Sequence, residues 1–190
     1  MSIQERRERE RREREQRIIA VARELAEAEG WDAVTTRRLA ELIEYSQPVL
    51  YSHFKGKAAI MAAVALEGFA ELAAELRAAR AAAPDPRTSL ADVAAAYVRF
   101  AATRPVLYEA MFTSDVDLAF ASPQTPAPLQ EGFSELREAV RPLAGSDDLD
   151  ARTEVFWASL HGLMTLTRAG RLPPEDHHRR LAILLRHFAA

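Results

Sequence analysis

The sequence predicts an all-α protein of about nine helices, in which a small N-terminal three-helix domain precedes a larger helical domain. Alanine, leucine, arginine and glutamate dominate, and β-branched residues never alternate with polar ones over the length of a strand. Glycines and prolines instead separate segments of helical length. With 190 residues, 48% of them hydrophobic, the chain is long and apolar enough to bury a sizeable core.

Composition narrows the class of protein further. The chain has no cysteine, which excludes disulfides, thiolate metal sites and a cysteine nucleophile. No apolar run is long enough to span a membrane, and the N-terminus is charged where a signal peptide would be apolar. We therefore expect a cytoplasmic protein that does not associate with membranes. Residues 1–60 carry 12 basic and 11 acidic side chains, whereas 61–190 carry 13 and 17, so a weakly basic region precedes an acidic one.

Residues 1–17 form a charged N-terminal extension. Between residues 4 and 17 there are seven arginines and five glutamates. One interpretation is a solvated helical extension with charge pairs four residues apart. The other is a basic arm that follows DNA phosphates.

Three helices are expected in the rest of the first 60 residues, with boundaries set by capping residues. Apolar residues recur at helical spacing from Ile18, and Gly30 ends that pattern. Thr35 and Thr36 suit the start of a second helix, and Ser46 suits the start of a third. The expected helices cover about 18–29, 37–43 and 47–53.

A larger helical region follows, and we assign residues 61–190 to it as a second domain. A long helix from about Lys57 to Ala81 leads into this region, and Pro84 and Pro86 indicate a linker after it. The remaining helices are expected at about Ser89–Thr103, Pro105–Phe112, Pro128–Leu143, Leu149–Ala169 and Glu175–Phe188.

The segment from Thr35 to Lys57 predicts a helix-turn-helix motif. Two short helices that cross need a small residue at the crossing, and Ala40 supplies it. Leu39, Ile43 and Leu50 then fall on inward faces, with Phe54 closing the small core. The polar side of the third helix meets no apparent core, and a helix of this length fits the major groove of DNA.

The candidate DNA contacts follow from this arrangement. Residues at the start of the third helix would approach base edges, and hydroxyl or cationic groups around it would approach phosphate oxygens. The proposed set is Thr36, Arg37, Ser46, Gln47, Pro48, Val49, Tyr51, His53 and Lys57. The alternative is an ordinary helical hairpin whose exposed polar residues bind nothing.

The stretch from Ile18 to Ile60 resembles the DNA-binding domain of the TetR family of bacterial regulators. The run LYSHFKGK, from Leu50 to Lys57, is its most specific part. The other matching residues are Ala22, Leu25, Gly30, Thr35, Thr36, Leu39, Ala40 and Ser46. The resemblance implies a regulator of transcription that binds a double-stranded DNA operator, with a family preference for repression relieved by a small-molecule effector. The rival is a helical dimeric ligand-binding or adaptor protein that has lost DNA binding.

Glu44 departs from the pattern of the family, which usually has glycine in this turn. The residue after a helix often takes positive φ, which costs a non-glycine residue about 1–2 kcal/mol. Its carboxylate would also lie near DNA phosphates. Alternatively, Glu44 forms a local salt bridge to Arg37 or Arg38 that holds the turn.

Two segments of the larger region resemble a C-terminal subtype of the family with a Trp-x-x-x-His-Gly element. Here that element is Trp157, His161 and Gly162. Trp157 and His161 share one helix face. Gly162 costs about 1 kcal/mol relative to alanine inside a helix, which suggests a close helix approach or room for another group.

An effector site and a dimer interface are expected in the same region. Aromatic, methionine and histidine side chains at helical spacing suit an apolar ligand cavity, although such residues also form ordinary core. The candidates for ligand binding are Tyr97, Phe100, Met111, Phe112, Phe133, Trp157, His161 and Met164. The resemblance implies a homodimer formed by the last two helices, with the apolar stripe Leu181, Leu184, Leu185 and Phe188 at its interface.

Nothing in the sequence indicates catalysis. His177 and His178 lie beside two acidic residues, but neighbouring residues on a helix point about 100° apart, which does not suit metal binding. There is no glycine-rich phosphate loop, nucleophile elbow or pair of histidines four apart. We expect no enzyme activity, no metal and no cofactor.

Overall fold

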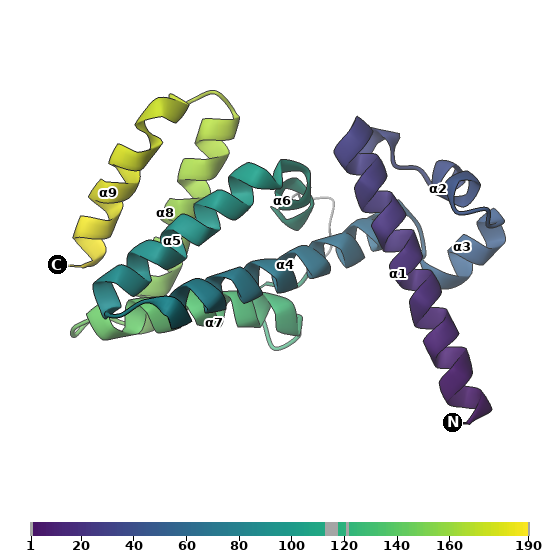
Figure 1. Cartoon of the computed structure of the whole chain (residues 1–190), viewed down its shortest axis with the longest axis horizontal. Helices are drawn as coiled ribbons and strands as arrows, with labels where there is room; N and C mark the ends of the chain where they lie inside the picture. The colour runs from purple at the N-terminus through teal and green to yellow at the C-terminus, as the bar shows by residue number, and fades with distance from the viewer. Residues whose placement is uncertain (1, 113–117, 121, 190) are drawn as a thin grey trace. The chain divides into compact units, whose positions relative to one another are not determined.

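The computed structural model describes residues 2–112, 118–120 and 122–189 (Figure 1). These residues contain helices and no strand, which confirms the all-α prediction. None of the helices in these residues is long and apolar enough to cross a membrane. The helices are α1 (Ile3–Glu29), α2 (Thr36–Leu42), α3 (Gln47–His53), α4 (Lys57–Ala82), α5 (Pro86–Thr103), α6 (Pro105–Phe112), α7 (Ala127–Val140), α8 (Leu149–Arg168) and α9 (His177–Phe188), with short 3₁₀ turns at Trp31–Ala33, Arg141–Leu143 and Pro174–Asp176.

The chain folds as two compact units. The first unit consists of Met1–Gly68 and Pro105–Gln124, and the second of Phe69–Arg104 and Thr125–Ala190. The first unit therefore holds α1, α2, α3, the beginning of α4, and α6. The second holds the rest of α4 together with α5, α7, α8 and α9. The grouping of α6 with the N-terminal helices does not follow from its place in the sequence.

Helix α1 begins well before the core of the first unit. Its side chains are buried only from Ile18 onwards. The helix starts far upstream because Ser2 and Glu5 form a reciprocal capping box, in which the Ser2 hydroxyl accepts from the Glu5 N–H and the Glu5 carboxylate from the Ser2 N–H. The charged extension is thus helical and continuous with α1.

Helix α6 packs closely on the start of α4 and is also tied to the turn after α1. A Cβ added at Gly68 would lie 2.8 Å from the Met111 sulfur and 2.9 Å from a Leu107 methyl, so the glycine permits this close approach. The Trp31 indole N–H donates to the Val106 carbonyl at 3.0 Å. These contacts make α6 part of the first unit.

The start of α5 corrects one prediction from the sequence. The helix begins at Pro86 rather than near Ser89, so Pro84 and Pro86 do not bound a longer linker. The Asp85 carboxylate accepts hydrogen bonds from the N–H groups of Arg87 and Thr88, at 3.0 Å each. Proline is well tolerated in the first turn of a helix, because its missing N–H has no partner there anyway.

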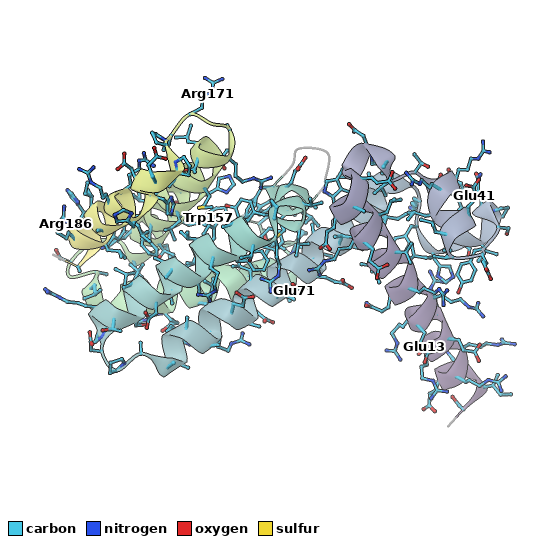
Figure 2. All side chains as sticks on the ribbon, turned by 45° about the horizontal axis from the view of Figure 1, so that its top comes forward. Glu13, Glu41, Glu71, Trp157, Arg171 and Arg186 are labelled. Carbon is cyan, nitrogen blue, oxygen red and sulfur yellow. The ribbon has the colours of Figure 1, made fainter. Side chains whose placement is uncertain are left out.

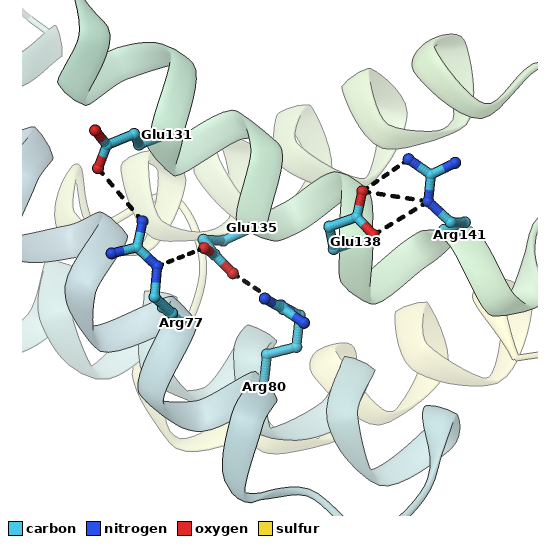
Figure 3. Close-up of polar contacts among 6 residues, drawn as sticks. All are labelled: Arg77, Arg80, Glu131, Glu135, Glu138 and Arg141. Carbon is cyan, nitrogen blue, oxygen red and sulfur yellow. Dashed lines mark hydrogen bonds and ion pairs between the residues drawn. The ribbon is translucent and has the colours of Figure 1, made fainter.

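In the second unit, a buried carboxylate joins α4 to α7. Glu135 on α7 is 6% exposed and accepts from Arg77 and Arg80 of α4, each at 2.8 Å (Figure 3). Arg77 also reaches the exposed Glu131 at 3.3 Å. Two charged donors compensate the loss of hydration at Glu135, which is the condition for burying a charge.

Candidate nucleic-acid interface

The predicted packing of α2 against α3 is confirmed. Leu39 and Leu50 are fully buried, and Ile43 is 2% exposed. Ala40 is also buried, at 3%, as expected for the residue where the helices cross. Phe54 is half-buried at the C-terminal end of α3. These residues fix α3 so that its other side faces outward.

The capping hydrogen bond predicted from the sequence forms at the start of α2 but not at the start of α3. The Thr35 hydroxyl accepts from the Arg38 N–H at 3.2 Å, which stabilises the start of α2. Ser46 occupies the corresponding position before α3, but its side chain makes no capping hydrogen bond. Ser46 is exposed to solvent.

The turn between α2 and α3 has the geometry that its family pattern predicts. Glu44 has φ 58°, and it is the one non-glycine residue with positive φ in the described chain. The Tyr45 N–H donates to the Ala40 carbonyl at 2.9 Å, and the Glu44 N–H to the Glu41 carbonyl at 3.3 Å. This pair of bonds is a Schellman motif, whose left-handed residue is usually glycine.

The alternative salt bridge from Glu44 does not form. Arg37 pairs with Glu41 at 3.0 Å, and Arg38 pairs with Glu29. Glu44 itself is exposed. Its left-handed backbone is therefore held by the Schellman hydrogen bonds and the packing of the helices, without help from its carboxylate.

The outer side of α3 exposes amide, apolar and aromatic groups. Gln47 and Pro48 are exposed in its first turn, Val49 is 39% exposed, and Tyr51 is 51% exposed. The Tyr51 hydroxyl lies 3.3 Å from that of Thr36, so the second turn of α3 and the start of α2 present these hydroxyls together. Exposed Arg37 lies next to this pair on α2.

Two of the predicted DNA contacts face into the unit instead. The His53 side chain is 6% exposed, and its Nδ1 lies 3.3 Å from the Glu15 carboxylate. The Lys57 ammonium donates to the Trp31 carbonyl. In this conformation both residues connect α3 and α4 to the elements that precede them, so they position the motif.

Glu15 is a charged anchor between α1 and α3. Burial raises the pKa of its carboxyl, but hydrogen bonds from His53 and Arg11 outweigh that effect, and the pKa lies below its ordinary value. The carboxylate is therefore ionised at neutral pH. Sequence reasoning missed this residue because its partner His53 lies 38 positions away.

The predicted effector residues divide between buried and half-buried positions. Tyr97, Phe100, Met111 and Met164 are at most 4% exposed, whereas Phe112, Phe133, Trp157 and His161 are half-buried. Met111 and Phe112 belong to the first unit and the other six to the second. In the second unit, the Trp157 indole N–H donates to the Tyr97 hydroxyl at 3.2 Å.

His161 extends the polar line that begins at Tyr97. Its ring lies 6.4 Å from that of Trp157, which is labelled on α8 in Figure 2, and its Nε2 lies 3.3 Å from the Thr165 hydroxyl. Burial lowers the pKa of the His161 imidazole. This histidine is therefore neutral at pH 7 and can accept or donate one hydrogen bond.

Gly162 does not mark a close helix approach among the described residues. A Cβ added there would have nothing within 4 Å. The glycine instead lies on a side of α8 that exposes apolar groups, with Val155 57% exposed and Leu166 46% exposed. These two residues lie seven positions before and four after Gly162, so all three share one helix face. That spacing was a readable signal in the sequence.

The apolar stripe of α9 packs largely within its own unit. Phe188 is 8% exposed and its ring lies 5.0 Å from that of Phe156. Leu181, Leu184 and Leu185 are half-buried. The exposed large apolar residue of α9 is Ile183, at 48%, which the sequence analysis did not select.

A helix-turn-helix head joined to an all-helical body is the architecture of a DNA-binding transcriptional regulator. Two family models match the chain, "Bacterial regulatory proteins, tetR family" over residues 18–64 and "Tetracyclin repressor-like, C-terminal domain" over residues 90–188. The chain belongs to the TetR family of transcriptional regulators, with a helix-turn-helix domain and a ligand-binding domain.

Individual relatives agree with this assignment. A stretch of 48 residues is 48% identical to the class C tetracycline repressor protein of Escherichia coli, and it covers 25% of this chain and 22% of that protein. A solved structure of a protein with unknown function from Rhodococcus sp. RHA1 is 25% identical with a TM-score of 0.72, over 92% of this chain and 93% of that chain. The putative regulatory protein SCO4313 is 24% identical with a TM-score of 0.74, over 95% and 97%.

Proposed function

We propose that this regulator is a cytoplasmic homodimeric repressor that binds a DNA operator through α3 and releases it when a small apolar effector binds the second unit. The outer side of α3 carries the proposal. Leu50 anchors the helix, while the side chains of Gln47, Pro48, Val49 and Tyr51 are left exposed by the part of the chain that the structure describes.

The exposed groups suit different parts of a duplex. The Gln47 amide can donate and accept at once, as adenine requires in the major groove, and Val49 suits a thymine methyl group. Tyr51, Thr36 and Arg37 carry hydroxyl or cationic groups that suit phosphate oxygens. His53 and Lys57 support this surface from behind, through Glu15 and the Trp31 carbonyl.

A homodimer would present two such surfaces. In the second unit, Val155 and Leu166 of α8 and Ile183 of α9 are exposed apolar residues on the two helices that the family uses for dimerisation. Gly162 leaves open space on the same face of α8, which lets another helix approach. A dimer would read two half-sites about 34–36 Å apart on one side of the DNA.

The effector would act through α6. This helix follows α5 after Arg104, yet it packs with the first unit through Gly68 and the bond from Trp31 to Val106. A ligand that contacts Tyr97 of α5 and Trp157 or His161 of α8 would therefore change the position of the end of α5, and with it α6. Release requires unequal affinity of the ligand for the two states, with a coupling of about 1–3 kcal/mol.

The proposal is tested by fluorescence anisotropy with duplex DNA from the region flanking its own gene. We expect salt-sensitive binding, and we expect Gln47→Ala to change base preference at one or two positions by about 1–3 kcal/mol. Gln130→Ala, an exposed glutamine of α7, is the control and should leave affinity and preference unchanged. A uniform loss of affinity for all sequences would exclude base reading by Gln47. No binding at any salt concentration would favour the adaptor alternative.

A further inference from the structure

The N-terminal half of α1 is a helix without a core. Its first buried side chain is Ile18, and among the described residues the turns before it contact only the end of α3, through Arg11 and Glu15 (Figures 1 and 2). The capping box of Ser2 and Glu5 fixes its start, so the helical form of this segment is built into the sequence. Because these turns bury no apolar side chain, their main property is the charge on their surface.

Ion pairs within the helix neutralise the arginines on one face of this segment. Arg6 pairs with Glu10 at 3.5 Å and Arg9 with Glu13 at 3.7 Å, both on one side of the helix. Glu5 is engaged in the capping box and Glu15 by His53 and Arg11. These contacts occupy all the glutamates of the segment except Glu8.

The ion pairs within the segment involve Arg6, Arg9 and Arg11. The other four arginines take no part in the ion pairs between described residues, namely Arg7, Arg12, Arg14 and Arg17. Two of them share a stripe with Arg11, because positions 7, 11 and 14 are separated by four and three residues. Arg11 donates to the Ser52 carbonyl at the end of α3, at 3.5 Å, and the next turn is tied to α3 by the contact between Glu15 and His53. The arginine stripe therefore borders the DNA-reading helix.

We propose that Arg7, Arg11 and Arg14 form a second DNA-binding surface, which contacts phosphates that flank the segment read by α3. This inference rests on the proposed DNA binding. Guanidinium groups are always charged and pair with phosphate oxygens in a two-pronged geometry, and three of them along one face would follow a phosphate backbone. The contact would be independent of base sequence, so it adds affinity and salt dependence without changing base preference.

The test uses the full chain and a duplex selected by the wild-type protein from a pool of random sequences. Arg7→Gln/Arg14→Gln is compared with Arg6→Gln/Arg9→Gln, which removes the same charge from the other side of the same helix. Each phosphate contact contributes about 0.9 to the slope of log affinity against log salt. We expect the first variant to reduce the slope by about 2, so that its affinity falls roughly tenfold less than that of the wild type between 50 and 200 mM salt.

Flank length gives a second readout. Duplexes with the same core and longer flanks should bind the wild type and the control variant more tightly until the flank reaches the stripe. The affinity of the Arg7→Gln/Arg14→Gln variant should not increase with flank length. The proposal of a second surface would be wrong if the two variants had equal slopes of log affinity against log salt, or equal increases in affinity with flank length. Neither result would affect the proposed DNA reading by α3. A wild-type protein that selects no duplex would overturn both, and circular dichroism checks that all variants keep their helix content.

Discussion

Glu44 shows how a single residue can oppose the local conformation that its neighbours impose. The Schellman bonds from Glu44 and Tyr45 close α2 and require a left-handed residue, which glycine adopts without strain. Glutamate adopts it at a cost of about 1–2 kcal/mol. Arg37 and Arg38 pair with Glu41 and Glu29, so neither of these arginines offsets the cost in the described chain.

Replacing Glu44 by glycine should therefore stabilise the protein. We expect Glu44→Gly to raise the free energy of unfolding by about 1 kcal/mol, which is a rise in Tm of about 2–4 °C for a chain of this size. Differential scanning calorimetry measures it. Glu41→Gly, three residues earlier within α2, is the matched control and should lower Tm, since glycine costs about 1 kcal/mol inside a helix. A lower Tm for Glu44→Gly would show that the glutamate side chain holds the turn.

The charge of Glu44 is separable from its backbone strain. Glu44→Gln removes the negative charge but keeps a side chain at positive φ. DNA affinity should then rise at low salt and return toward the wild-type value as salt increases, because exposed charges are screened over about 10 Å at 0.1 M. Its Tm should equal that of the wild type within about 1 °C.

His161 gives the second unit a dependence on pH. Because burial lowers the pKa of the native imidazole, the unfolded chain binds a proton more readily than the native protein does. Stability should thus fall as the pH drops below about 6.5, the ordinary value for histidine. His161→Gln keeps a hydrogen-bonding group near Thr165 and removes the titration, so its loss of stability between pH 7.5 and 5.5 should be smaller than that of the wild type. Urea unfolding at both pH values measures this, and His178→Gln, exposed on α9, should behave as the wild type.

At the scale of elements, the contact between α4 and α6 depends on the absence of one methyl group. Gly68 lies against the Met111 sulfur and a Leu107 methyl at distances that a Cβ would violate. The Trp31 indole fixes the same helix from its other end through Val106. The position of α6 in the first unit is therefore defined by tight packing, and such packing responds to small changes.

Gly68→Ala should displace α6 or its side chains. We expect a loss of about 1–3 kcal/mol from overpacking, together with altered DNA affinity if α6 transmits effector binding. Gly132→Ala, in a helix position with open space, is the control and should stabilise the protein by up to about 1 kcal/mol. Chemical denaturation and anisotropy measure the two effects. If the Gly68→Ala variant is as stable as the Gly132→Ala variant, the Met111 side chain can move aside without cost. The position of α6 would then not depend on tight packing at Gly68.

At the scale of the whole molecule, the proposed dimer depends on apolar residues that the single chain leaves exposed. Among the side chains predicted for this role from the sequence, the three leucines are half-buried and Phe188 packs on Phe156. Val155, Leu166 and Ile183 are the large apolar residues of α8 and α9 that the described chain leaves exposed. A second copy of the chain would cover them and give the two-fold symmetry that a palindromic operator requires.

Ile183→Asp should separate the dimer without unfolding the chain. A carboxylate buried in the interface would lack a partner, which costs several kcal/mol, whereas in the monomer it is hydrated. Sedimentation velocity should show a monomer with unchanged circular dichroism. Leu184→Asp is the contrast, because this half-buried residue should lower the Tm of the chain itself. A stable Ile183→Asp dimer would place the interface elsewhere.

The sequence by itself determined the helices, the motif and the strained turn. The bounds of α3 and α6 match their predicted ranges, and Glu44 has the positive φ expected of it. Periodicity, caps and turns depend on residues within a few positions of each other, so a linear pattern contains them. Even the early start of α5 at Pro86, capped by Asp85, was readable in this way, although the neighbouring prolines indicated a linker.

Only the tertiary structure decided which of the candidate side chains are exposed to a binding partner. His53 turns to Glu15, 38 positions away, and the Trp31 indole to Val106, 75 positions away. The same holds for Ile183, which is exposed, whereas the leucines near it on α9 are half-buried in the second unit. Burial and partners are set by groups distant in sequence, and the physical reason is that many pairings of helical faces satisfy one periodic pattern until packing selects among them.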